Sequence, residues 1–179
     1  QPVTSQINMD EYVKLFEPIL ESGKDVLHIT LSSGISGTIN SANLAKEQME
    51  EKYPDRKVCI VDSLGASSGY GLLITEAWNR KEQGVSLLDN VKWLEENRLN
   101  LHHWFFSTDL TSYVRGGRIS KVSGFFGNAL NICPLLNMNT EGRLIPRIKC
   151  RGKKQVIREI VQKMENHAKD GLDYSGKCY

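Results

Sequence analysis

The sequence has little of what marks several large classes of protein. Its 179 residues hold four cysteines, Cys59, Cys133, Cys150 and Cys178, and no two of them form a CxxC pair. This spacing disfavours a structural zinc site and a disulfide-stapled scaffold, so we expect reduced thiols. No apolar run approaches the roughly 20 residues of a membrane-spanning helix, and no signal-peptide pattern opens the chain. We therefore expect a globular cytoplasmic protein without stable insertion into a membrane.

Motifs for metal, cofactor and nucleotide chemistry are also missing. The sequence contains no GxxxxGKS/T loop, no complete GxGxxG fingerprint and no HExxH pair. These absences disfavour a self-contained kinase, a dehydrogenase and a metalloenzyme. Asp62 follows an apolar run, and the simplest interpretation is an acid that caps the end of a strand. We accordingly expect no metal ion and no cofactor.

The net charge of +2 conceals an uneven distribution along the chain. Residues 111–158 hold ten Lys and Arg and one acid, Glu141, for a charge of +9, and the remainder carries −7. We expect a boundary near residue 108, which gives domains 1–107 and 108–179. The basic part favours a phosphate-bearing or acidic partner. A regulatory nucleic-acid-binding module is the weaker alternative, because aromatic residues are not interleaved with these charges as base stacking requires.

Residues 1–107 alternate short apolar runs with longer helical patterns, which is typical of βαβ units around a parallel sheet. Asn8 and Glu11 have the spacing of a capping box, Pro18 is expected to kink the helix that follows, and Gly84 fits a C-cap. The expected helices span residues 9–22, 38–52, 68–83 and 86–97, and the expected strands span residues 26–31, 58–61 and 102–106.

Residues 108–179 show shorter elements. The last helix is expected to be amphipathic, with one apolar face formed by Val156, Ile160, Val161 and Met164. The fold class is therefore α/β, with a parallel-sheet domain followed by a smaller α/β domain. The expected elements are a helical turn over 109–114, a helix over 121–131, a β-hairpin of strands 133–138 and 144–149, and the helix over 155–168.

Residues 32–38, Ser-Ser-Gly-Ile-Ser-Gly-Thr, join an apolar strand to a helix. The start of a helix leaves backbone N–H groups unpaired and carries the positive end of the helix dipole, so it attracts an anion. Hydroxyl groups add further hydrogen-bond donors. This loop therefore predicts the site of an anionic ligand head. Alternatively, Ser33 or Ser36 simply caps the helix.

Ser36 is also a candidate nucleophile. The segment that begins at Gly34 differs from the GxSxG elbow of α/β-hydrolases, because its second glycine comes one position early. A nucleophilic serine needs a general base, and His28 lies within a predicted strand, where a core or face histidine is the simpler interpretation. His102 and His103 point to opposite faces of one strand, so at most one serves any single site. A serine-dependent hydrolase or acyltransferase that uses Ser36 with His28 or His102 is the enzymatic alternative.

Six short motifs along the chain carry a resemblance to a known family. They are Thr4-Ser5-Gln6, the 32–38 loop, Val61-Asp62-Ser63, Gly116-Gly117-Arg118-Ile119-Ser120, Pro134-Leu135-Leu136 and Lys149-Cys150-Arg151-Gly152-Lys153. In their order and spacing, the chain resembles the DegV family of bacterial fatty-acid-binding proteins. The resemblance implies a parallel-sheet α/β domain, a smaller C-terminal α/β domain and a long-chain fatty acid buried between them. It also implies a non-catalytic, lipid-carrying subunit of a fatty acid kinase, whose separate ATP-binding subunit phosphorylates the bound carboxylate to an acyl phosphate.

The resemblance also implies roles for particular residues. The hydroxyls of Thr4 and Ser36 would bind the fatty acid carboxylate, with help from backbone N–H groups at Gly37 and Thr38. Two arginines of the basic part would lie at the pocket mouth and meet the kinase subunit, namely Arg118 and Arg151. Candidates for the acyl tunnel are Ile35, Phe125, Phe126, Leu130 and Ile132.

Members of the family have segments that this sequence does not show. A strand with an Asp-Ser motif precedes their Thr-Ser-Gln motif, and a strand with a His-x-Gly-Pro-Gly segment lies near their C-terminus. The resemblance therefore implies a chain that is truncated at both ends. We expect the protein to be a monomer.

Overall fold

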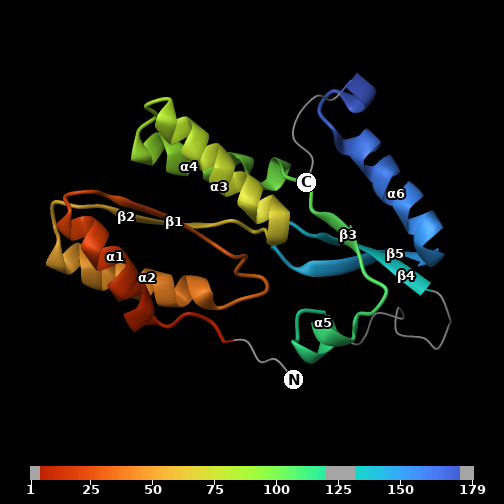
Figure 1. The fold of residues 1–179 in the computed structure, drawn as a ribbon, viewed down its shortest axis with the longest axis horizontal. Coiled ribbons are helices and arrows are strands. Elements are labelled where there is room, and N and C mark those ends of the chain that lie inside the picture. The colour runs from red at the N-terminus through yellow and green to blue at the C-terminus, as the bar shows by residue number, and fades with distance from the viewer. Residues whose placement is uncertain (1–4, 120–131, 174–179) are drawn as a thin grey trace. The chain divides into compact units, whose positions relative to one another are not determined.

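The structure is a computed structural model, and it describes residues 5–119 and 132–173 (Figure 1). The chain divides into two compact units, Gln1–Leu101 and His102–Tyr179. The first unit contains α1 (Met9–Glu21), β1 (Val26–Thr30), α2 (Thr38–Lys52), β2 (Val58–Asp62), α3 (Ser67–Glu82), α4 (Leu87–Asn97) and the 3₁₀ helix η1 (Arg98–Asn100). The second unit contains β3 (Trp104–Phe106), α5 (Thr111–Arg115), β4 (Ile132–Met138), β5 (Leu144–Arg151), α6 (Gly152–His167) and η2 (Gly171–Asp173).

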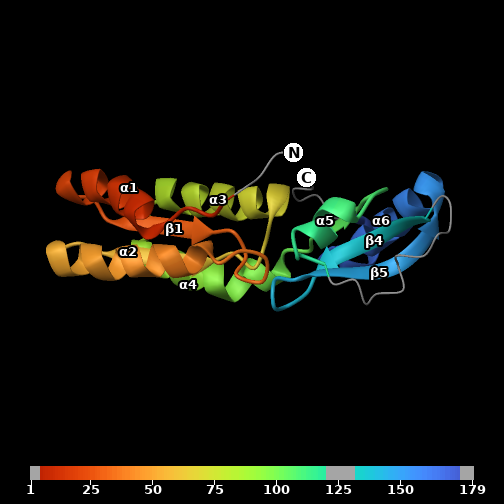
Figure 2. The same cartoon turned by 90° about the horizontal axis from the view of Figure 1, so that it is seen from below.

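In the first unit, β1 and β2 pair in parallel, with Val26 beside Val58 and Thr30 beside Asp62. Helices α1 and α2 cover one face of this pair, and α3 and α4 cover the other (Figures 1 and 2). Both faces of the strands are therefore buried, which explains why their sequences are almost continuously apolar. The predicted parallel-sheet α/β architecture is confirmed. One face buries Tyr12, Phe16, Leu20, Ala42, Ala45 and Met49, and the other buries Leu73, Ala77 and Leu94.

Short sequence signals fix several helix ends in the first unit. The Asn8 side chain accepts a hydrogen bond from Glu11 N, and the Glu11 carboxylate accepts one from Asn8 N, both at 2.9 Å. This reciprocal pair confirms the capping box. Helix α1 runs through Pro18 to Glu21. Gly84, just beyond the end of α3, has a φ of +82°, as expected for a glycine that ends a helix.

His28 lies on β1 among aromatic side chains of α1. The centre of its ring is 5.0 Å from that of Tyr12 and 5.5 Å from that of Phe16. No residue in the described ranges forms a hydrogen bond with its buried Nε2 atom. Burial lowers the pKa of His28, because a charged imidazolium loses hydration in these surroundings. His28 is half-buried, which agrees with the interpretation of a core or face histidine.

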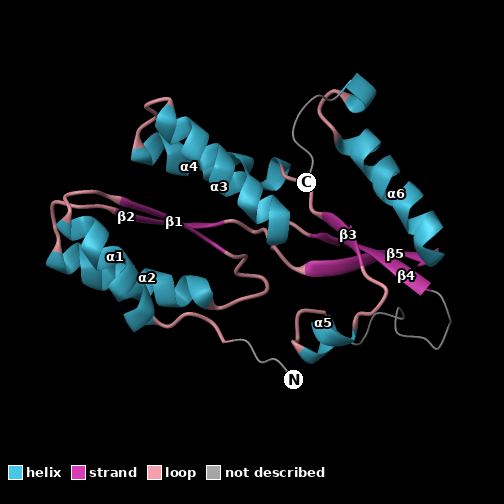
Figure 3. Cartoon of the chain, in the orientation of Figure 1, coloured by secondary structure: helices cyan, strands magenta, loops and turns pink. Residues whose placement is uncertain are grey.

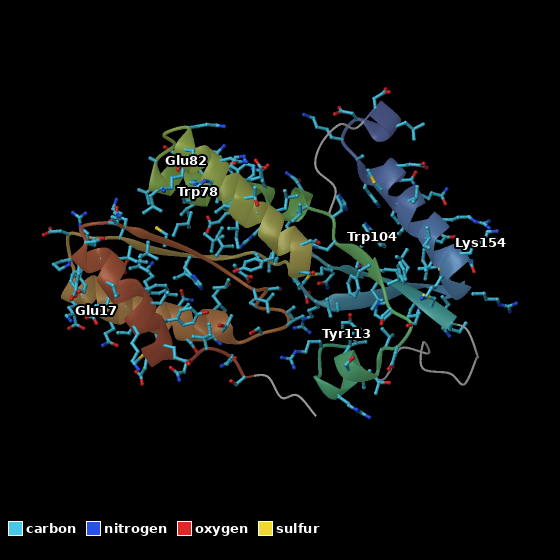
Figure 4. The ribbon with its side chains drawn as sticks, viewed as in Figure 1. Glu17, Trp78, Glu82, Trp104, Tyr113 and Lys154 are labelled. Carbon is cyan, nitrogen blue, oxygen red and sulfur yellow. The ribbon has the colours of Figure 1, made fainter. Side chains whose placement is uncertain are left out.

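In the second unit, three strands form an antiparallel sheet in the order β3-β4-β5 (Figure 3). The predicted hairpin of β4 and β5 is confirmed, with Cys133 opposite Cys150. Helix α6 packs on one face of this sheet through Val156, which is fully buried. Trp104 on β3, labelled in Figure 4, packs against the same cluster. This unit is the smaller α/β domain that the sequence predicts.

The strand predicted over residues 102–106 belongs to a different sheet from the one we expected. Its place ahead of the basic segment favours the first half of the chain, but β3 pairs antiparallel with β4, with Phe105 opposite Leu136. Assignment of this strand to the first half is therefore wrong. The compact units divide before His102, ahead of the change in charge. The distribution of charge along the sequence describes the surface of each part. Which sheet a strand joins depends instead on the apolar side chains that pair across neighbouring strands.

The predicted apolar face of α6 is only partly correct. Val156 is fully buried and Ile160 packs beside it, but Val161 and Met164 are 48% and 42% exposed. Each residue of a helix turns by about 100°, so Val161 lies about 140° and Met164 about 80° from Val156 around the axis. The core therefore takes the first two side chains and leaves the other two near solvent. The helix predicted over residues 121–131 lies outside the described residues.

Leu94 and Leu88 offer a matched test of the α3–α4 core, because both lie on α4. Leu94 is fully buried and Leu88 is 54% exposed. Leu94→Ala should lower the free energy of unfolding by about 2–5 kcal/mol, since it removes buried methyl groups and leaves a cavity. Leu88→Ala removes the same atoms from an exposed position and should cost under about 0.5 kcal/mol. Urea unfolding of both variants measures the difference, and equal losses would contradict this core.

Acidification should destabilise the first unit through His28. The unfolded chain takes up a proton near the ordinary pKa of 6.5, whereas the folded chain resists protonation until lower pH. The contribution of neutral His28 to the free energy of unfolding is therefore fully present above pH 6.5. It is lost as the pH falls from 6.5 toward the lowered pKa of the folded state. His28→Phe keeps a ring without a titratable group, so unfolding free energy should fall less steeply with pH. The two slopes should differ by at most about 1.4 kcal/mol per pH unit.

Urea unfolding of wild type and His28→Phe between about pH 5 and 7 makes this comparison. The pKa values of His102 and His103 are also lowered by burial, but both histidines are present in both proteins and cancel in the difference. Identical slopes for the two proteins would show that His28 is not held in its neutral form by the fold.

Candidate functional site

Two loops leave the same edge of the parallel strand pair. The segment of residues 31–37 connects β1 to α2, and the segment of residues 63–66 connects β2 to α3. Parallel strands end at one edge of their sheet, and in α/β folds that edge is where ligands bind. The loop that the sequence singles out, residues 32–38, lies at this edge.

Ser32 organises the turn at the start of the 32–38 loop. Its side chain is fully buried, and its N–H donates to the carbonyl of Gly65 at 3.0 Å. Its carbonyl accepts from Ile35 N at 3.2 Å and from Ser36 N at 3.1 Å. Its hydroxyl accepts from Gly34 N at 3.1 Å. The loop is therefore a folded turn whose backbone groups have defined partners.

Asp62 ties the two loops together. One oxygen of its carboxylate, Oδ1, accepts from Ser33 N at 3.1 Å and from Leu64 N at 3.0 Å. The interpretation of Asp62 as an acid at the end of a strand is confirmed. Within the ranges 5–119 and 132–173, no group of three or more His, Cys, Asp or Glu side chains is placed to hold a metal ion.

The start of α2 has an open hydrogen-bonding arrangement. Gly37 is its N-cap residue and makes no side-chain cap bond, so a cap by Ser33 is absent. The hydroxyl of Ser36 accepts from Thr38 N at 3.3 Å, and it donates to no acceptor among the residues described. The Gly37 N–H likewise has no acceptor among them. The oxygen of the Ser36 hydroxyl therefore accepts from one N–H at the start of α2. Its hydrogen is available for a bond to a ligand.

Thr38 has a structural partner of its own. Its hydroxyl lies 2.7 Å from the hydroxyl of Tyr12 on α1, and both side chains are buried. This bond fixes the first residue of α2 against α1. Since the Thr38 N–H donates to Ser36 Oγ at 3.3 Å, both the hydroxyl and the N–H of Thr38 have partners within the protein.

The Thr-Ser-Gln motif lies beside the loop. An added Cβ on Gly37 would come within 2.9 Å of Gln6 Oε1, so the Gln6 carboxamide lies directly against this glycine. Two motifs that are some thirty residues apart in the sequence thus meet in the fold. Thr4, the residue of this motif predicted to bind the ligand, lies outside the described residues. Gln6 has no predicted role, and its contact with Gly37 is visible only in the folded chain.

The histidines of the enzymatic alternative have other surroundings. His28 lies between aromatic rings in the core, and its Nε2 has no partner within the described ranges. His102 stacks on His167 with ring centres 4.6 Å apart, and burial, followed by the charge of His167, lowers the pKa of His102. Within the described residues of the first unit, His28 forms no hydrogen bond with Ser36.

The other predicted site residues have separate environments. The guanidinium of Arg118 folds back on its own turn and donates to the carbonyl of Gly116. Arg151 is exposed, and its backbone N–H donates to the Gln155 side chain at 2.6 Å. Two of the tunnel candidates, Ile35 and Ile132, are partly buried. The remaining three lie outside the described residues, namely Phe125, Phe126 and Leu130.

Arg98 contributes to this edge of the sheet although no motif contains it. From the start of η1, its guanidinium Nη1 donates to the backbone carbonyl of Asp62 at 2.7 Å. Thirty-six positions separate the two residues. No local pattern therefore indicates the contact, and only the packing of α4 and η1 beside β2 produces it.

Comparison with known proteins places the chain in a family. A family model described as an uncharacterised protein of the DegV family matches residues 1–175. A DegV domain-containing protein of Clostridium perfringens is 38% identical over 164 residues, which cover 92% of this chain and 56% of that protein. The chain thus spans a little over half the length of the curated relatives it matches.

Solved structures give the same result. A DegV family protein of Thermus thermophilus, described by its fatty acid binding, is 34% identical with a TM-score of 0.82 over 94% of this chain and 58% of that one. The fatty acid kinase (Fak) B3 protein of Streptococcus pneumoniae, loaded with linoleic acid, is 27% identical with a TM-score of 0.79 over 89% and 56%. No helix in the described residues has the length and apolar character to cross a membrane. From its motifs, its fold and these matches, the chain belongs to the DegV family.

Proposed function

We propose that this protein binds a long-chain fatty acid and holds its carboxylate at the 32–38 loop of the first unit. The observation that carries the proposal lies at the start of α2. There, the Ser36 hydroxyl and the Gly37 N–H are two hydrogen-bond donors that have no acceptor among the described residues. The fatty acids bound by the DegV proteins of Thermus thermophilus and Streptococcus pneumoniae support this choice of ligand.

The chemistry of the loop suits a carboxylate. Donors at the start of a helix lie at the positive end of its dipole, which favours a negative group over a neutral one. Gly37 lets the Gln6 carboxamide lie where a side chain would stand, and its φ of −82° is an ordinary one. A carboxylate has two oxygens, so one can accept from Ser36 Oγ and the other from the Gly37 N–H.

Thr4 completes the proposed carboxylate site. The resemblance to the family implies that the Thr4 hydroxyl binds the ligand, and Gln6, two residues further on, lies against Gly37. Gln6 itself is therefore placed at the loop. A second hydroxyl would give the carboxylate a third donor and reinforce the preference for an anion.

The protein's own role in this proposal is to carry the acid, not to phosphorylate it. A separate kinase subunit in the cytoplasm would supply ATP, and the bound carboxylate oxygen would attack its γ-phosphate to give an acyl phosphate and ADP. Arg118 and Arg151 of the second unit belong to the basic segment proposed to meet that subunit. The presence of a Fak B3 protein among the similar structures supports the partner.

The Ser36 hydroxyl can be tested by its removal. Ser36→Ala takes away one hydrogen bond to a charged group, so the affinity for palmitate should fall by about tenfold or more. Isothermal titration of delipidated protein with palmitate measures the change, and native mass spectrometry of protein purified from bacteria should show less retained fatty acid.

Ser22→Ala is the matched control for this measurement. Its hydroxyl, like that of Ser36, bonds with a nearby backbone group, here by donating to the carbonyl of Ile19, but it lies at the C-terminal end of α1. We expect its palmitate affinity to equal that of the wild type. Equal affinities for wild type and Ser36→Ala would rule out Ser36 as a carboxylate ligand, and a wild type that neither retains nor binds fatty acid would remove the proposed function.

A further inference from the structure

We infer that Asp62 is a positioning residue of the anion site, which it serves by holding the backbone of Ser33 without touching the ligand. This inference rests on the proposed function, because it concerns the same loop. The single oxygen Oδ1 accepts from Ser33 N at 3.1 Å and from Leu64 N at 3.0 Å. These two N–H groups belong to loops that leave neighbouring strands, so one carboxylate oxygen joins both.

The second loop is a firm anchor for the first. Ser63 N donates to the carbonyl of Thr30 at 3.2 Å, which continues the β1–β2 pairing by one step. The hydroxyl of Ser63 bonds with both the N–H and the carbonyl of Gly65, at 3.0 and 3.2 Å. The same carbonyl accepts the N–H of Ser32 at 3.0 Å. The 32–38 loop is thus attached to this turn at two successive residues, Ser32 and Ser33.

The backbone conformation of Leu64 also depends on its hydrogen bond with Asp62. Its φ is +47°, in the left-handed region that a branched, bulky side chain rarely adopts. Such a conformation persists only where surrounding bonds hold it. The bond from Leu64 N to Asp62 is one of them, so removal of the carboxylate releases both the strained turn and the Ser33 N–H.

The backbone of Asp62 is itself held by a hydrogen bond from Arg98. The guanidinium Nη1 of Arg98 donates to the Asp62 carbonyl at 2.7 Å. The backbone of Asp62 is therefore held by Arg98, and its side chain by two backbone donors. Arg98 also brings a positive charge to a place where an anion and a carboxylate would otherwise lie near each other without compensation.

The charge of Asp62 separates a positioning role from an electrostatic one. A carboxylate near an anionic ligand repels it, so the contribution of Asp62 must come from its acceptor oxygen. Asp62→Asn keeps an oxygen at the same place and removes the charge. Asp62→Ala removes both, and Asp62→Glu keeps the charge but displaces the oxygen by one methylene. The affinity for palmitate should therefore follow the order Asn equal to or above wild type, then Glu, then Ala.

Asp25 provides a matched control at the opposite end of the same two strands. Its Oδ1 accepts from Lys57 N at 2.9 Å, so it too joins the backbones around β1 and β2 through one carboxylate oxygen. It lies before the amino ends of the strands, away from the 32–38 loop. Asp25→Ala should lower stability through the loss of the same kind of bond and should leave palmitate affinity unchanged.

The experiment titrates palmitate into the delipidated full chain of each protein and measures its urea unfolding in parallel. We expect Asp62→Ala to bind about fivefold or more weakly, and Asp62→Asn and Asp25→Ala to bind within about twofold of wild type. Wild-type affinity in a folded Asp62→Ala overturns the inference alone. No palmitate binding by the wild type overturns the proposed function together with the inference.

The other variants decide the result if Asp62→Ala does not fold. Folded Asp62→Asn with affinity equal to or above wild type, together with weaker binding by Asp62→Glu, supports the inference. Folded Asp62→Asn that binds more weakly than Asp62→Glu overturns it, because the charge and not the position of the acceptor would then matter. A loss of affinity in Asp25→Ala as large as that in Asp62→Ala also overturns it, since strand stability alone would explain both.

Discussion

The parallel pairing of β1 with β2 is the constraint on which the candidate site depends. Thr30 stands beside Asp62, so the two strands end level and release their loops at one edge. Helices on both faces bury the strands, which leaves this edge as the place where backbone groups of both loops come together. The hydrogen bonds from Ser33 N to Asp62 and from Ser32 N to Gly65 exist only because the ends coincide. A shift of register by one residue would separate these donors from their acceptors.

The hydroxyl groups of the 32–38 loop have different roles, and their burial explains which of them is available to bind a ligand. A buried hydroxyl needs a partner within the protein, and the buried hydroxyls of Ser32 and Thr38 bond with Gly34 N and with Tyr12. Ser36 is only partly buried, and among the described residues it accepts one bond. The structure thus uses two hydroxyls to shape the loop and leaves a third with a hydrogen to donate. Composition alone does not distinguish these roles, since all three residues belong to the same short motif.

Local signals predict most elements of this fold, and long-range contacts account for what sequence reasoning misses. Asn8 and Glu11 form the predicted capping box because the bond joins residues three apart and needs no other part of the chain. The position of the 32–38 loop follows from the alternation of strand and helix. Arg98 reaches Asp62, and Gln6 reaches Gly37, across about thirty residues or more, so only the packed helices bring them together. Strand β3 is misassigned for the same reason, because its partner β4 follows it after a long interval.

The basic segment of the second unit bears on how a kinase subunit would associate under the proposed function. Its basic side chains differ in their contacts. Arg147 Nε donates to Asn137 at 2.8 Å and Arg118 donates to Gly116, and the exposed Lys154 lies on α6 (Figure 4). A cation that is already held loses less side-chain freedom when a partner binds. Exposed charges of one sign mainly raise the rate of encounter with an acidic surface, and salt screens that effect. The arginines held by these bonds are therefore suited to orient a partner, and the positive charge of the whole segment to attract it.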